Sequence, residues 1–133
     1  MESTLEDYIN YRIKRAWETF DDAKLLLESK SWISSINRMY YACFYIVLAL
    51  FVKNDINSHT HSGVKTQLSL HFIKTGKIRK DMGVLYEDLF DYRHKGDYDD
   101  FFEFEEETVI ALIPKVEEFI KEIETLINSS PNP

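Results

Sequence analysis

The side chains with the most chemical potential lie in residues 91–98, which read DYRHKGDY. Arginine binds phosphate well because its guanidinium is planar, always charged and able to hold two oxygens at once. A histidine can take up and return a proton near neutral pH. The stretch therefore suggests an anion site, with a structural alternative: a Gly-containing turn whose arginine pairs with the acids around it. The candidate catalytic residues are Arg93, His94, Asp97 and Tyr98, and Lys95 is a candidate binding residue.

A second candidate is Arg38, the single formal charge in the apolar stretch 32–52. At 100° per residue, a helix places Arg38 on one face with Tyr41 and Tyr45, so Arg38 and Tyr41 are candidate binding residues. The structural alternative is a buried arginine paired with an acid, because a buried charge needs a partner. We expect Arg38 to be largely buried and bonded to a carboxylate or a tyrosine hydroxyl. The carboxylates considered are Glu87, Asp88 and Asp91.

Signatures of metal or cofactor chemistry are missing from the sequence. It has no Gly-rich phosphate loop, nucleophile motif or His-Glu zinc helix. His59 and His61 flank Thr60, but no carboxylate or cysteine completes a ligand set at metal spacing, so we interpret both as loop or helix-capping residues. His71 is interpreted as a helix-face residue. The only cysteine, Cys43, can form no internal disulfide. We expect no metal and no cofactor.

The stretch that must position these residues is the apolar segment 32–52. From residue 39 to residue 52 every position is apolar or aromatic. A helix that is hydrophobic all round is a membrane span or the centre of a packed core. A span needs roughly 20 apolar residues, more than this run supplies. We therefore expect a buried central helix. The N-terminal residues are acidic and contain no signal peptide, so we expect a cytoplasmic protein without membrane contact.

The remaining periodicity predicts an all-α fold, an antiparallel helical bundle of about five helices. A first helix capped by Ser3 or Thr4 should end near residues 29–30, and Ser31 should cap the central helix. A third helix should begin near Ser62 and stop at Gly76. A fourth should cover 79–92 and break in the RHKGDYDDF turn, and a fifth should cover 103–127. We expect one domain, 1–128, and a disordered tail, 129–133. The net charge of −7 argues against broad nucleic-acid binding but permits a local basic patch.

Three short segments resemble one known family. They are NRMYYACFY (37–45), SHTHSGV (58–64) and RHKGDY (93–98). In order and spacing they resemble the HEPN domain, within it the subgroup that reads Arg-x-Tyr-Tyr-Ala, Ser-His-x-Gly-Val and Arg-x-x-(Ala/Gly)-Asp-Tyr. The inserted His61 in the second motif is a departure. The resemblance covers roughly residues 8–126.

The resemblance implies a helical bundle that dimerises, with a site around Arg93 that faces its symmetry mate. Many HEPN proteins are metal-independent endoribonucleases that act as toxins, often encoded beside a minimal nucleotidyltransferase antitoxin. In some of these toxins the partner adenylylates the motif tyrosine, which corresponds to Tyr98 here. Other members bind nucleotides or serve as scaffolds. A homodimer also fits the aromatic residues near the motif, Tyr98, Phe101 and Phe102, which a short turn cannot bury in its own subunit.

Active members carry a histidine four to six residues after the motif arginine, and this chain departs from that pattern. Its next histidine, His94, is adjacent to Arg93, and Tyr98 occupies the far end of the motif. A tyrosine with an ordinary pKa near ~10 is a poor base at neutral pH. The sequence thus supports an RNA-directed toxin-like protein or a degenerate relative. The alternatives are a non-catalytic module that binds a nucleotide or partner protein, and a purely structural dimer.

Overall fold

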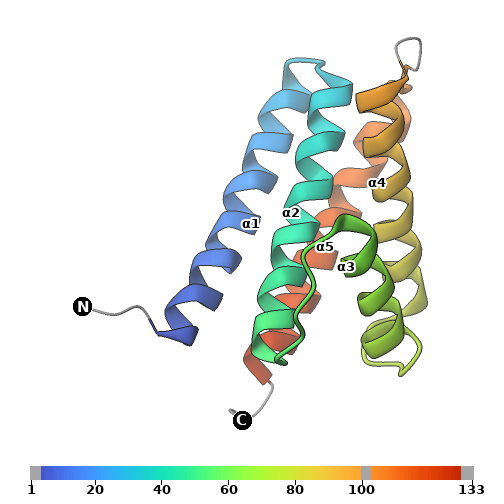
Figure 1. Cartoon of the computed structure of the whole chain (residues 1–133). Helices are drawn as coiled ribbons and strands as arrows, with labels where there is room; N and C mark the ends of the chain where they lie inside the picture. The colour runs from blue at the N-terminus through green and yellow to red at the C-terminus, as the bar shows by residue number, and fades with distance from the viewer. Residues whose placement is uncertain (1–3, 100–102, 130–133) are drawn as a thin grey trace.

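Helices alone make up the secondary structure of the computed structural model, which describes residues 4–99 and 103–129. Figure 1 shows α1, α2, α4 and α5 running side by side, with the short α3 beside the lower half of α4. The expected all-α bundle of about five helices is confirmed. The helices are α1 (Leu5–Glu28), α2 (Trp32–Lys53), α3 (His61–Leu68), α4 (Lys80–Tyr98) and α5 (Glu106–Ser129), and a π-helical turn, η1 (Ser69–Ile73), follows α3.

The apolar helix α2 is the centre of the bundle and touches α1, α3, α4 and α5. Among the described helices, α2 alone is long and apolar enough to cross a membrane, yet 67% of its apolar window is buried inside the protein. Tyr40, Ile46 and Leu50 are completely buried. This burial agrees with a central core helix. Cys43 lies in the same core as a free thiol, and burial raises its pKa.

A short link joins α1 to α2 as antiparallel neighbours. Thr4 begins α1 with a capping box, in which its hydroxyl accepts from the Asp7 N–H and the Asp7 carboxylate accepts from the Thr4 N–H. The buried Ser35 hydroxyl donates to the Ala23 carbonyl at 2.8 Å and ties the two helices together. Ser31, expected to cap α2, occupies the N-cap position but makes no side-chain capping bond.

The end of α4 differs most from the sequence-based expectation. The helix continues through RHKGDY to Tyr98, so this stretch is not a turn. Gly96 lies inside the helix, at a point where two neighbouring side chains approach the backbone closely. A Cβ atom there would lie 3.1 Å from Ile33 Cγ2 and 3.4 Å from Phe104 Cε2. The glycine that suggested a break therefore permits close packing instead.

The other boundaries shift by a few residues. Thr60 caps α3 by accepting from the Gly63 N–H, so the helix begins at His61. Gly76 has φ +78°, which is consistent with the expected helix stop just beyond η1. The last helix begins at Glu106 rather than near 103 and includes Ser129, which was expected to begin the tail. Residues 130–133 of that tail, like Phe101 and Phe102, lie outside the described residues.

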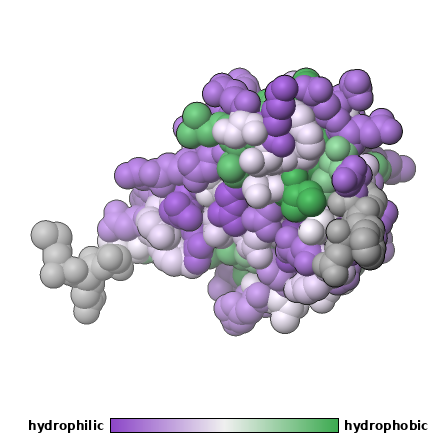
Figure 2. Space-filling view, turned by 90° about the horizontal axis from the view of Figure 1, so that it is seen from above, coloured by the Kyte–Doolittle hydropathy of each residue, from purple (hydrophilic) through white to green (hydrophobic). Residues whose placement is uncertain are grey.

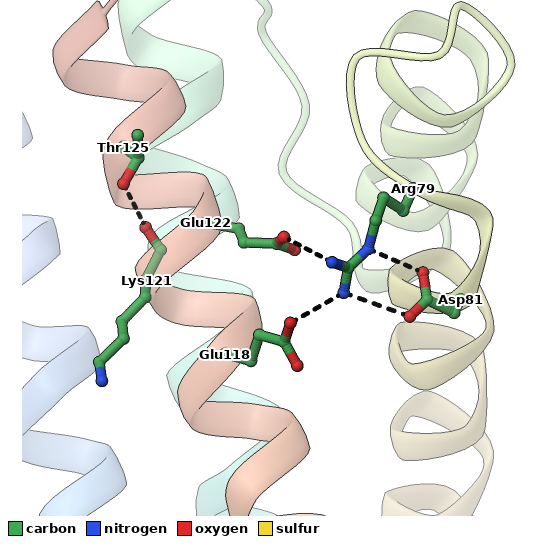
Figure 3. Close-up of polar contacts among 6 residues, drawn as sticks. All are labelled: Arg79, Asp81, Glu118, Lys121, Glu122 and Thr125. Atoms are coloured by element: carbon green, nitrogen blue, oxygen red, sulfur yellow. Dashed lines mark hydrogen bonds and ion pairs between the residues drawn. The ribbon is translucent and has the colours of Figure 1, made fainter.

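An exposed ion-pair cluster joins the start of α4 to α5 (Figure 3). The Arg79 guanidinium contacts Asp81 at 3.1 Å, Glu118 at 3.0 Å and Glu122 at 2.9 Å. These carboxylates raise the pKa of Arg79. One guanidinium is shared by three carboxylates, which indicates a clamp between helices rather than a vacant anion site.

The opposite end of α4 lies beside the α1–α2 link, at the top of Figure 1. Figure 2 views this end from above. Hydrophilic residues cover most of it, and the exposed hydrophobic residues form small separate patches. Such scattered apolar groups are ordinary on a protein surface and do not by themselves mark an interface.

Candidate functional site

Arg93 lies on α4 in a nearly enclosed position. Its side chain is 11% exposed, and its Cζ atom lies 4.9 Å from the centroid of the Tyr40 ring. Its one ion pair within the described residues is long, with Nη1 3.5 Å from Asp97 Oδ2. The Nε–H is buried and finds no acceptor among the described residues. A buried charge with so little compensation is costly, so a bound anion would stabilise it.

Arg93 stacks on Tyr40, which is fully buried in α2. Burial raises the pKa of its hydroxyl to about 12, so Tyr40 keeps its proton at neutral pH. The hydroxyl lies 2.8 Å from His61 Nδ1. If the His61 Nδ1–H donates this bond to the Tyr40 oxygen, Nε2 on the far side of the ring keeps a free lone pair, which a proton acceptor needs. Tyr40 thus joins a fixed cation and a histidine in one cluster.

His61, the first residue of α3, packs against aromatic rings of α2. Its ring centroid lies 4.7 Å from that of Phe44 and 5.7 Å from that of Tyr41. Burial, and secondarily the positive charge of Arg93, lower the pKa of His61 below its usual value of 6.5. The imidazole is therefore neutral at pH 7, the form that can accept a proton in catalysis.

The four predicted catalytic residues of α4 divide between two helix faces. Arg93 and Asp97, four positions apart, form the ion pair over Tyr40. His94 and Tyr98 also lie four apart, with ring centroids 4.7 Å from each other, and Tyr98 is 71% exposed. One helical step turns the second pair by about 100° from the first. Within one subunit, His94 therefore shares no helix face with Arg93.

The predicted binding residues are placed differently from one another. Lys95 is exposed, two helical steps from Arg93, which places it roughly 200° around α4. Tyr41 lies beside the Arg93 cluster, with ring centroids 5.2 Å from Tyr40. Arg38 stacks on Tyr41, with Cζ 5.0 Å from the ring centroid. Arg38 and Tyr41 thus extend the cluster along α2.

The partner expected for Arg38 is wrong. Its Nε and Nη2 donate to the Asn37 side-chain oxygen at 3.1 and 2.8 Å, and no carboxylate or tyrosine hydroxyl bonds it in the described structure. It is half-buried rather than enclosed. The physical reason is that a partly exposed guanidinium keeps its hydration, so an aromatic face and an amide oxygen are sufficient partners.

Sequence reasoning interpreted His61 as a loop or capping residue and so missed its place beside Arg93. The available signal was the extra histidine in SHTHSGV, the motif's one departure from its pattern. The sequence argument judged His61 only as a possible metal ligand, and without further ligands nearby it gave His61 no functional role. Among the described residues, no group of three His, Cys, Asp or Glu side chains is placed to hold a metal ion.

Comparison with known proteins defines the family. The model of the HEPN domain family matches residues 9–126, nearly the whole chain. The chain is a HEPN protein. This agrees with the resemblance of its three motifs and with its all-helical bundle. The HEPN match covers both Arg93 and His61.

Several relatives of this HEPN protein carry names. A UPF0332 protein of Thermotoga maritima is 45% identical over 122 residues, covering 92% of each chain. A Methanocaldococcus jannaschii protein named "Putative toxin MJ0605" is 30% identical over 125 residues, covering 90% of this chain and 93% of the relative. A second protein of that organism, "Putative toxin MJ0142", is 30% identical over 103 residues, covering 77% and 70%. The chain thus has relatives with toxin names over most of its length.

Proposed function

We propose that this HEPN protein is the toxin-like component of a HEPN–nucleotidyltransferase module and acts in the cytoplasm on RNA. Its reaction is metal-independent endoribonuclease cleavage, with Arg93 as the phosphate ligand. The observation that carries the proposal is the state of Arg93, an enclosed guanidinium with one long ion pair and an unsatisfied Nε–H. The toxin names of two relatives support the toxin-like role.

His61 supplies the proton chemistry that such a cleavage requires. The ribose 2′-OH loses its proton to a base and its oxygen attacks the adjacent phosphorus, while the bond to the 5′-oxygen breaks and that oxygen receives a proton. His61 is neutral at pH 7 and lies, through Tyr40, beside the charge that would hold the phosphate. We assign proton transfer to His61 and electrostatic stabilisation to Arg93.

His94 and Tyr98 lie on a different face of α4 from Arg93 in their own subunit, and in a homodimer they would lie close to the Arg93 site of the other copy. In the two-fold arrangement that the HEPN resemblance implies, the α4 ends of the two copies face each other. His94 and Tyr98 of one copy could then complete the site of the other, as donor and acceptor groups around the leaving oxygen. Asp97 would hold Arg93 in place until phosphate displaces it.

A specific observation favours a second candidate, a non-catalytic nucleotide- or partner-binding module. Tyr98 occupies the position where active HEPN members carry histidine. In that case Arg93 would bind the phosphate of a nucleotide without turnover. Incubation with labelled nucleotides separates the two candidates, since retention without RNA cleavage would support the second.

Regulation by adenylylation fits the exposure of Tyr98. Its ring is 71% exposed on the last turn of α4, so an enzyme could reach the hydroxyl. An attached nucleotide would bring a negative phosphate and a bulky base close to the site. We expect a cognate nucleotidyltransferase to add one adenylyl group to the wild type and none to Tyr98→Phe, as measured by intact-protein mass.

Growth arrest on induced expression tests the proposed function in cells. Wild type should arrest growth, and Arg93→Met should not. The matched control is Lys121→Met, which removes one exposed cation from α5, away from the Arg93 site. Equal arrest by wild type and Arg93→Met, at equal protein levels, would overturn the site assignment.

A further inference from the structure

The tyrosines and arginines of α1 and α2 form one continuous contact chain that the Arg93 site does not explain. We name it the Arg/Tyr strip. At one end of the strip, the Tyr41 ring contacts His61, which is bonded to Tyr40 beneath Arg93. The strip therefore ends at the candidate site. Its members are Tyr8, Tyr11, Arg12 and Arg15 on α1, and Arg38, Tyr41 and Tyr45 on α2.

Arg12 is the hub of the α1 half. Its Cζ lies 5.2 Å from the Tyr8 ring centroid, 5.8 Å from that of Tyr11 and 5.7 Å from that of Tyr45. Its Nε and Nη2 donate to the Tyr8 hydroxyl at 3.1 and 2.9 Å. Arg15 lies 5.5 Å from the same Tyr45 ring. Both guanidinium groups therefore lie close to aromatic rings.

The strip is accessible and its charge is largely unneutralised. Tyr8 is 42% and Tyr11 53% exposed. Arg12 and Arg38 have no carboxylate partner among the described residues, and Arg15 has a distant one, Glu18, 4.0 Å away. The protein has 23 acidic and 16 basic residues, so acids are plentiful elsewhere. Arginines left without acids in an acidic chain suit a polyanion.

We propose that the Arg/Tyr strip is a binding track for single-stranded RNA that leads to Arg93. Exposed aromatic rings stack on unpaired bases, and arginines contact the backbone between them, which is the pattern of single-strand binding surfaces. A duplex would hide the base faces that the tyrosines need. The track rests on the proposed function only for the fate of the RNA at Arg93, because binding can be measured without cleavage.

A second copy of the chain is the competing occupant of the strip. A two-fold contact centred there would bring Arg12 and Arg15 close to their own copies. Like charges placed together at an interface are unfavourable, and no ion pair within the described residues offsets Arg12. Charge complementarity therefore favours RNA over self-association at this surface.

Fluorescence anisotropy in a buffer with EDTA tests the track. The probe is a labelled single-stranded RNA of about twelve nucleotides, within the ~4–16-nucleotide range of single-strand sites. Tyr11→Ala should weaken binding about fivefold or more and leave its salt dependence unchanged. Arg12→Gln should weaken binding and reduce the slope of log affinity against log salt by about 0.7, the share of one phosphate contact. Lys24→Gln, a cation on another face of α1, should change affinity less than twofold. A duplex of the same length should bind more weakly than the single strand.

The failures of the track and of the ribonuclease are distinguishable. Failure of the wild type to bind overturns the track, as does full binding by folded Tyr11→Ala and Arg12→Gln, or equal duplex affinity. A lower mass of Arg12→Gln in light scattering would overturn it too, because the strip would then join copies of the chain. Weakened binding in both variants without cleavage by the wild type would support the track and refute the ribonuclease. If Arg93→Met abolishes cleavage while the strip variants bind RNA as tightly as the wild type, the ribonuclease is supported and the track is refuted.

Discussion

Replacing Arg93 with methionine should stabilise the protein while removing its function. The substitution loses the stacking on Tyr40, worth about 1 kcal/mol, and the long pair with the partly exposed Asp97, worth about 0.5 kcal/mol. It also removes the unsatisfied buried Nε–H, a cost of about 2 kcal/mol. Methionine fills a similar volume on the Tyr40 ring, and Asp97, 31% exposed, can be hydrated. The net gain is about 0.5 kcal/mol, or roughly 1–3 °C in Tm.

Thermal unfolding followed by circular dichroism measures this gain. The matched control is Arg79→Met at the N-cap of the same helix. Arg79 is bonded to Asp81 and Glu118 and paired with Glu122 (Figure 3), so its loss should lower Tm. The two arginines should therefore shift Tm in opposite directions. A fall of several degrees for Arg93→Met would refute the reasoning, because Arg93 would then hold the fold together rather than await an anion.

Three other predictions concern the cluster, the fold and the assembly. The lowered pKa of His61 means that the unfolded state binds more protons than the folded state below about pH 6.5, so the free energy of unfolding should fall as the pH falls through that window. Urea unfolding at about pH 7 and about pH 5 measures this loss, which should be smaller in His61→Gln than in the wild type. Equal losses in the two proteins would contradict the assignment. Gly76→Ala should lower the free energy of unfolding by about 1 kcal/mol, because φ is +78° there and no neighbour would contact the new methyl group. A urea denaturation midpoint equal to that of the wild type would contradict this. Light scattering after size exclusion should give the mass of a homodimer at tens of micromolar, and a monomer would remove the shared site.

The helical bundle follows from the sequence because its signals are local and repeated. The apolar stretch 32–52 could only be satisfied at the centre of a core, and periodic apolar positions supplied the flanking helices. The end of α4 did not follow, since Gly96 reads as a helix breaker until Ile33 and Phe104 are known to lie against it. That packing joins residues far apart in the chain, which local reasoning does not reach.

The candidate site was predictable in part for the same reason. Arg93 was selected by its chemistry, which does not depend on its neighbours. The role of His61 depends on α3 bringing its ring to the Tyr40 hydroxyl, 21 residues away in sequence. Arg38 was assigned a carboxylate because a fully buried charge would need one, but it lies half-exposed beside Asn37 and Tyr41. Placement in the tertiary structure, rather than residue type, decided both outcomes.

Cleavage of RNA in EDTA by purified wild type and Arg93→Met tests the central claim most directly. The two proteins are compared at equal concentration, with their unfolding curves recorded from the same preparations. Wild type should cut the RNA without divalent metal, and the folded Arg93→Met protein should not. Cleavage at the wild-type rate by Arg93→Met, or cleavage by the wild type that EDTA stops, would contradict the account.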